Sequence, residues 1–94
     1  MDKTIQHEIS LLDLVAEEAS ELAHASLKVS RILLGVNPTP ITIDKAVSNL
    51  IEECADVELC IAKLVEEGYI NKDDIMKIVK EKNERWNKRL KGEM

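Results

Sequence analysis

The chain has 94 residues, no phenylalanine and only two aromatic residues, Tyr69 and Trp86. This length allows one domain near the lower end of independently stable sizes, with a core built from Leu, Ile, Val and Ala. The net charge of −5 argues against a general binder of nucleic-acid polymers or anionic membranes. We therefore expect a single domain over residues 1–94.

The sequence predicts a cytoplasmic protein with no membrane partner. Asp2 and Glu8 interrupt the start of the chain, and the apolar runs are far too short to cross a bilayer. Cys54 and Cys60 lie on one predicted helix, separated along its axis by roughly 9 Å. That separation is too large for a disulfide, so both are interpreted as small buried hydrophobes in a reducing compartment.

The first predicted helix covers residues 3 to about 34. Apolar residues recur along it at helical spacing, and Gly35 is the first helix-breaking residue and a suitable C-cap. A helix of this length exceeds the usual globular helix, so we expect a kink or a break inside it. Asn37-Pro38-Thr39-Pro40 follows as a stiff extended connector.

The second predicted helix covers about residues 43 to 67. Thr42 is a typical N-cap residue, and Asp44 in the first turn is favoured by the helix dipole. Gly68 supplies the stop signal.

The third predicted helix covers about residues 72 to 91. Asn71 and Asp74 have the spacing of a capping box at its start, with Asp74 in place of the usual Glu or Gln. No segment alternates like a strand, so the predicted fold class is all-α, with three helices. Three helices cannot cover the apolar stripes of this chain. We therefore expect a homodimer or homotetramer with a four-helix-bundle-like core.

One glutamate of an acidic pair lies in the apolar stripe of each of the first two predicted helices. The first stripe consists of Leu11, Val15, Glu18, Leu22, Ala25, Val29 and Ile32. The second consists of Ala46, Leu50, Glu53, Val57, Cys60 and Leu64. The acidic pairs lie three positions apart on a shared helix face, Glu18 with Glu21 and Glu53 with Asp56. Because a charge on a core-facing edge is costly unless it is paired or metal-bound, converging carboxylates predict a metal site.

A basic ridge follows the third predicted helix and consists of Lys82, Arg85 and Arg89. Lys and Arg in this arrangement suit phosphate oxygens, and Arg can bind two at once. The alternative is that the ridge only complements the helix dipole and faces solvent. Trp86 is predicted as a core anchor, and Asn83 as a buried amide that needs hydrogen-bond partners.

Carboxylates opposed by a basic ridge suit the hydrolysis of a phosphoric anhydride. Mg²⁺, or Mn²⁺ in its place, prefers carboxylate oxygens and commonly bridges them to substrate phosphates. Such an ion can orient a water nucleophile, while Lys and Arg hold the remaining phosphates.

The residues that carry this chemistry resemble a known family. The segments Glu17-Glu18-Ala-Ser-Glu21 and Glu52-Glu53-Cys-Ala-Asp56 are similar to the E-E-x-x-E … E-E-x-x-D signature of MazG-type nucleotide pyrophosphohydrolases. That all-α superfamily includes dimeric dUTPases and phosphoribosyl-ATP pyrophosphohydrolases. The segment Asn83-Glu-Arg85-Trp86-Asn-Lys-Arg89 resembles the family's N-x-[KR]-[aromatic]-x-x-R ending. The resemblance spans about residues 8 to 90.

The resemblance implies a MazG-like enzyme that splits the α–β anhydride of a nucleoside triphosphate into monophosphate and pyrophosphate. The implied ligands of Mg²⁺ are Glu18, Glu21, Glu53 and Asp56. The implied contacts to the nucleotide are Asn83, Arg85 and Arg89, with Lys82 on the same ridge. Glu17 and Glu52, one position away from these ligands, are candidate general bases. Family members form dimers or dimers of dimers.

Two other functions remain open on the sequence. Glu21 and His24 form a Glu-x-x-His pair, which also occurs in di-iron and di-manganese carboxylate bundles. Such a site needs a second copy of the motif, and His7 has no Glu three positions before it. The other alternative is a non-catalytic helical interaction or regulatory protein whose acidic faces are solvated.

Overall fold

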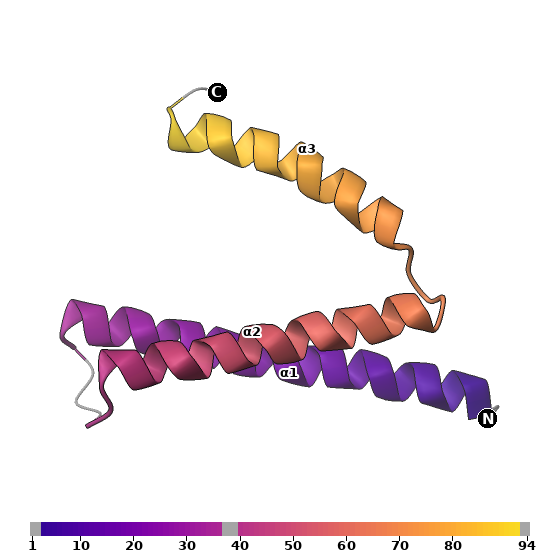
Figure 1. Cartoon of the computed structure of the whole chain (residues 1–94), viewed down its shortest axis with the longest axis horizontal. Helices are drawn as coiled ribbons and strands as arrows, with labels where there is room; N and C mark the ends of the chain where they lie inside the picture. The colour runs from indigo at the N-terminus through magenta and orange to yellow at the C-terminus, as the bar shows by residue number, and fades with distance from the viewer. Residues whose placement is uncertain (1–2, 37–39, 93–94) are drawn as a thin grey trace.

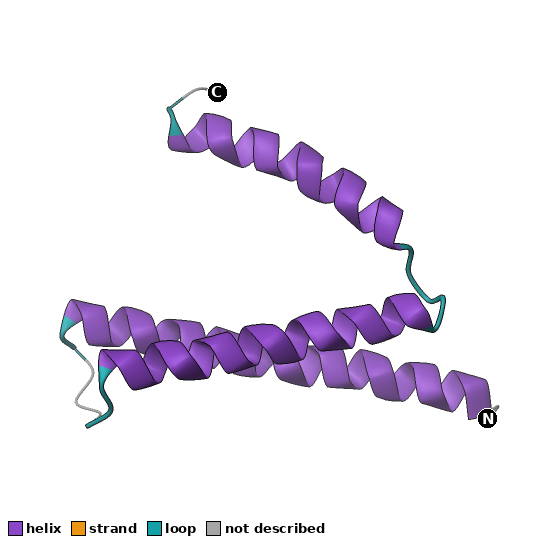
Figure 2. Ribbon diagram, viewed as in Figure 1, coloured by secondary structure: helices purple, strands orange, loops and turns teal. Residues whose placement is uncertain are grey.

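The structure is a computed structural model that describes residues 3–36 and 40–92. The described ranges form three α-helices and no strand: α1 (Lys3–Leu34), α2 (Ile43–Glu66) and α3 (Lys72–Leu90) (Figures 1 and 2). The all-α prediction is confirmed, and α2 and α3 each end one residue before the expected position. Residues 37–39 of the predicted connector lie outside the described part.

The expected break in α1 does not occur. The helix runs without interruption over 32 residues (Figure 1). The stretch contains no Pro or Gly, which are the usual causes of a sharp kink. Its apolar stripe also packs against α2, and this tertiary contact stabilises a helix longer than the average globular one.

Glycines end α1 and α2 in the same way. Gly35 adopts a φ of 71°, and its N–H donates to the carbonyl of Ile32 (3.0 Å). The next N–H, that of Val36, donates to the carbonyl of Arg31 (3.2 Å). This pair of bonds is a Schellman motif, which requires a left-handed residue and so favours glycine. Gly68, with a φ of 78°, closes α2 with the corresponding pair of bonds.

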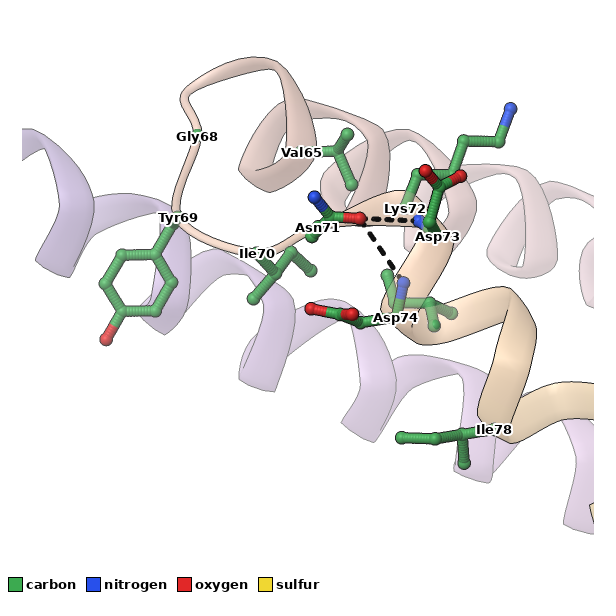
Figure 3. A pocket seen from close by; sticks show the side chains of 10 residues that line it. Val65, Gly68, Tyr69, Ile70, Asn71, Lys72, Asp73, Asp74 and Ile78 are labelled. Carbon is green, nitrogen blue, oxygen red and sulfur yellow. Dashed lines mark hydrogen bonds between the residues drawn. The ribbon is translucent and has the colours of Figure 1, made fainter.

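The predicted N-caps of α2 and α3 are both present. The Thr42 hydroxyl accepts a hydrogen bond from the Lys45 N–H (3.1 Å). The Asn71 side-chain oxygen accepts bonds from the N–H groups of Asp73 (2.7 Å) and Asp74 (3.3 Å) (Figure 3). These bonds satisfy donors that the first turn of a helix leaves free, so they fix where α2 and α3 begin.

α1 and α2 pack side by side as an antiparallel hairpin (Figure 1). Every residue of the two predicted stripes is buried or half-buried, which confirms the helical period read from the sequence. The buried apolar residues of the described chain are Ala46, Cys60 and Leu64, so the core of one chain is thin. The prediction that Cys54 is buried is wrong. Position 54 follows the stripe residue Glu53 and is turned away from α1 by about 100°.

α3 does not pack on the hairpin of its own chain. It leaves the end of α2 through the turn at Gly68 and diverges from both other helices (Figure 1). Trp86 is therefore 60% exposed and Leu90 85% exposed, and Asn83 is exposed as well. Within one chain, the predictions that Trp86 is a core anchor and that Asn83 is a buried amide are both wrong, because no described residue covers this part of α3.

The isolated chain is too extended for its size. Its radius of gyration is 17.2 Å, against about 12 Å for a compact domain of this length. Its accessible surface is 7584 Å², against about 5,500 Å² for a compact protein of this mass. One chain therefore exposes roughly 2,000 Å² more than a compact fold would.

None of the described helices is long and apolar enough to cross a lipid bilayer.

Candidate metal centre

Three carboxylates converge near the middle of the hairpin. Glu18 comes from α1, and Glu53 and Asp56 come from α2. One oxygen from each residue lies within 4.8 Å of the other two. We call these three residues the acidic cluster. Glu18 and Glu53 are half-buried because they occupy the facing stripes, whereas Asp56 is exposed, so the cluster is accessible from one side.

Two oxygen atoms of this cluster lack any partner. The Oε2 atoms of Glu18 and Glu53 are shielded from solvent and accept no hydrogen bond from the described residues. A shielded carboxylate oxygen without a donor is energetically costly. A proton, a cation or a water molecule at these atoms would remove that cost.

The electrostatics of the cluster favour the same conclusion. Burial raises the pKa of Glu18 above its ordinary value, and the negative charges of Glu21 and Asp56 raise it further. Burial is also the largest cause that raises the pKa of Glu53, and the negative charges of Glu21 and Asp56 raise it further. The neighbouring carboxylates thus make Glu18 and Glu53 harder to ionise, and a bound cation would remove that repulsion.

Glu21 lies beside the cluster rather than within it. It belongs to no group of three converging ligand atoms among the described residues, and its side chain is exposed. It is nevertheless close enough to Glu53 for charge repulsion and a side-chain hydrogen bond to raise the pKa of that residue. A hydrogen bond between two carboxyl groups requires a shared proton, which a cation could replace.

The candidate bases flank the cluster at its edge. Glu17 is exposed and adds to the charge that raises the pKa of Glu18. Glu52 does the same for Glu53.

Cys60 is adjacent to the cluster but chemically quiet. Burial raises the pKa of its thiol, and the charges of Glu18 and Asp56 raise it further. The thiol therefore stays protonated near neutral pH and is a poor nucleophile. Cys60 packs as a small hydrophobe, as the sequence predicts.

The basic ridge lies elsewhere in the same chain. The three residues of the ridge and Asn83 are the predicted nucleotide contacts. All four are exposed on α3: Lys82, Asn83, Arg85 and Arg89. Because α3 diverges from the hairpin, the fold of one chain does not bring these residues to the acidic cluster (Figure 1).

A hollow next to the acidic cluster was not predicted from the sequence. Its volume is about 230 Å³, and it lies between the second half of α1 and the first half of α2. The residues that line it are His24, Ala25, Lys28, Ala46, Asn49, Glu52 and Glu53. We call it the alanine hollow, because Ala25 and Ala46 occupy the stripe positions where it forms. The sequence signal for this hollow is the presence of a small residue in each stripe, Ala25 in α1 and Ala46 in α2.

A larger hollow, of about 740 Å³, lies in the angle between α2 and α3 (Figure 3), and no residue of the acidic cluster lines it. Val65, Ile70, Ile75 and Ile78 give it an apolar lining, and Asp73 and Asp74 stand at its edge. Apolar side chains in an open angle suit coverage by another helix better than they suit chemistry on a phosphate.

The histidines do not join the acids. In the described ranges, His24 belongs to no group of three potential metal ligands. His7 lies at the other end of the hairpin, where its Nε2 is 3.4 Å from Oε1 of Glu67. The geometry of one chain therefore offers a carboxylate cluster without the histidines that a di-iron site of the Glu-x-x-His type uses.

Comparison with known proteins gives no match: no family model, no curated protein and no solved structure matches this chain. The resemblance to MazG-type pyrophosphohydrolases therefore depends on the motif residues alone.

Proposed function

We propose that this chain hydrolyses a nucleoside triphosphate at the α–β anhydride and releases a monophosphate and pyrophosphate. The observation that carries the proposal is the acidic cluster, in which Glu18, Glu53 and Asp56 present oxygens within 4.8 Å of one another. Two of these residues each hold a shielded oxygen with no described partner. A bound cation would satisfy both of these atoms and offset the repulsion between the two carboxylates.

The residues of the cluster fit Mg²⁺ or Mn²⁺. Their donors are hard carboxylate oxygens, which these ions prefer over nitrogen or sulfur. Glu18, Glu53 and Asp56 would hold the ion, and Glu21 would supply a fourth carboxylate from the next turn of α1. The bound ion would neutralise phosphate charge and polarise a water molecule.

The chain's own residues supply the remaining functions. Glu52 lines the alanine hollow beside the cluster, so it is better placed than Glu17 to accept the proton of the attacking water. Arg85 and Arg89 would bind the departing pyrophosphate, because guanidinium groups hold two phosphate oxygens at once.

The basic ridge would reach the acids from a second copy of the chain. We infer a homodimer, or a tetramer made from two dimers, in which α3 of one chain packs on the hairpin of the other. The charges are complementary: α3 has seven basic and four acidic side chains, whereas α1 and α2 together have five basic and eleven acidic ones. Two chains would cover roughly 4,000 Å² of excess surface, within the range of obligate homodimers.

The direct test is pyrophosphate release from a panel of canonical, oxidised and deaminated nucleoside triphosphates, with and without Mg²⁺. We expect Mg²⁺-dependent formation of monophosphate and pyrophosphate from at least one substrate, and its loss in Asp56→Asn. Glu58→Gln is the matched control, because Glu58 is an exposed acid of α2 outside the cluster. If no triphosphate is hydrolysed while the protein is folded and oligomeric, a helical interaction protein is the better assignment.

A further inference from the structure

Two small side chains, one from each helix of the hairpin, line the alanine hollow. Ala46 is 1% exposed and Ala25 is half-buried, and both line the hollow. Larger aliphatic residues at these stripe positions would fill the space between the helices. Glu53 belongs both to this hollow and to the acidic cluster, so the two sites are continuous.

One rim of the alanine hollow is basic. His24 and Lys28 line it from α1, four positions apart and therefore on one helix face. The same two residues line a second hollow of about 420 Å³, together with Leu27 and Arg31. His24, Lys28 and Arg31 therefore follow one face of α1 along two adjoining hollows. We call them the α1 ridge.

Lys28 and Arg31 of this ridge have no ionic partner within the described residues. The ion pairs of the described residues join other side chains: His7 with Glu67, and Lys63 with Glu66. Lys28 and Arg31 are exposed and can contact a ligand. Lys28 lies seven positions after Glu21, which separates the acids from the ridge by about 10 Å along the helix axis.

We propose that the α1 ridge binds a second phosphate group of the substrate, remote from the anhydride that is cleaved. The inference rests on the proposed function and narrows its substrate class to nucleotides that carry an additional phosphate on the nucleoside side, such as a 3′-phosphate. The nucleoside would lie in the alanine hollow. There, Asn49 and His24 offer hydrogen bonds to hydroxyl or base edges, and Lys28 and Arg31 bind the phosphate beyond it.

Calorimetric binding to the full chain in Mg²⁺ tests this assignment without relying on turnover. The probes are adenosine 3′,5′-bisphosphate, AMP and inorganic phosphate. We expect the bisphosphate to bind at least tenfold more tightly than AMP. In the double variant Lys28→Ala, Arg31→Ala this preference should disappear while AMP affinity stays unchanged. Lys45→Ala, an exposed lysine of α2 outside both hollows, should keep the preference.

The outcomes separate this proposal from the hydrolase proposal. Equal affinity of the wild type for AMP and the bisphosphate overturns the α1 ridge as a phosphate site, even if triphosphates are hydrolysed. A preference that persists in the double variant also overturns it. Inorganic phosphate that binds as tightly as the bisphosphate would assign the ridge to a free anion and overturn the substrate class. A preference for the bisphosphate that depends on Lys28 and Arg31, without hydrolysis of any triphosphate, supports the α1 ridge as a phosphate site and overturns the hydrolase proposal.

Discussion

Glu18 of α1 and Glu53 of α2 meet across the hairpin, and each holds one carboxylate oxygen that is shielded from solvent and has no described hydrogen-bond partner. Both residues lie in the apolar stripes that hold the two helices together. The packing that builds the fold therefore also forces two like charges into proximity. This conflict between packing and charge underlies the first two predictions.

Mg²⁺ should raise the thermal stability of the protein. Binding to the native state alone stabilises it, and at 100 times the dissociation constant the melting temperature of a chain this size should rise by roughly 10 °C. Melts with Mg²⁺ are compared with melts in a monovalent salt at matched ionic strength. Glu53→Gln should lose most of the shift, and Glu58→Gln should keep it. Equal melting temperatures in both salts would show that the acids form only a solvated face.

The metal-free protein should lose stability as the pH rises from the ordinary range of glutamate towards neutrality. The pKa values of Glu18 and Glu53 are raised in the folded state, so the folded chain holds these protons more tightly than the unfolded chain does. Their favourable contribution is present at the acidic end of this window and disappears as both groups ionise. Melting curves against pH in a chelator should show a shallower decline for Glu53→Gln than for the wild type. Parallel curves would contradict the prediction.

Glu53→Gln and Arg85→Ala should both abolish or severely reduce triphosphate hydrolysis, by different routes. Gln removes one charge from the acidic cluster, so Mg²⁺ affinity should fall while metal-free stability stays similar or increases. Ala at position 85 leaves the acids intact, so stabilisation by Mg²⁺ should persist while nucleotide affinity decreases. Calorimetric titrations of Mg²⁺ and nucleotide, with steady-state pyrophosphate release, distinguish the two routes. Wild-type rates in both variants would remove these residues from an active site.

Mixing these two inactive variants should restore activity if the basic ridge acts across the dimer. A mixed dimer has one site with intact acids from the Arg85→Ala chain and an intact ridge from the Glu53→Gln chain. Random exchange of chains should therefore recover about a quarter of the wild-type rate. The two proteins are unfolded, mixed and refolded before the assay, with each variant refolded alone as the control. A mixture as inactive as its components would place the ridge and the acids in the same chain.

The protein should be at least a dimer, with Trp86 in the contact. Trp86 is the single tryptophan and is 60% exposed in one chain, so its fluorescence reports on coverage by a partner. Light scattering at micromolar concentration should show a dimer or tetramer, and dilution should shift the emission to longer wavelength. Trp86→Ala should raise the dissociation constant at least tenfold, whereas Lys77→Ala, an exposed residue of α3, should not. A stable monomer at this concentration would sink the dimer proposal.

The sequence by itself determined the features that depend on local rules. Thr42 and Asn71 cap their helices because their side chains reach free N–H groups of the first turn, and Gly35 ends α1 because it adopts a left-handed conformation. The helical period also placed Glu18 and Glu53 on facing stripes. One contact between two amphipathic helices was enough to bring them together, so spacing predicted three of the four converging carboxylates, and Glu21 lies beside the cluster.

Only the tertiary structure decided which surfaces meet. The spacing of α3 predicts an apolar stripe that includes Trp86, but the divergence of α3 after Gly68 leaves Trp86, Leu90 and Asn83 exposed in the chain. The alanine hollow likewise depends on the register of the hairpin, which brings Ala25 and Ala46 to the same hollow. The helical period of the sequence identifies the apolar face of a helix. The element that covers this face, and the register of the contact, depend on residues distant in the sequence.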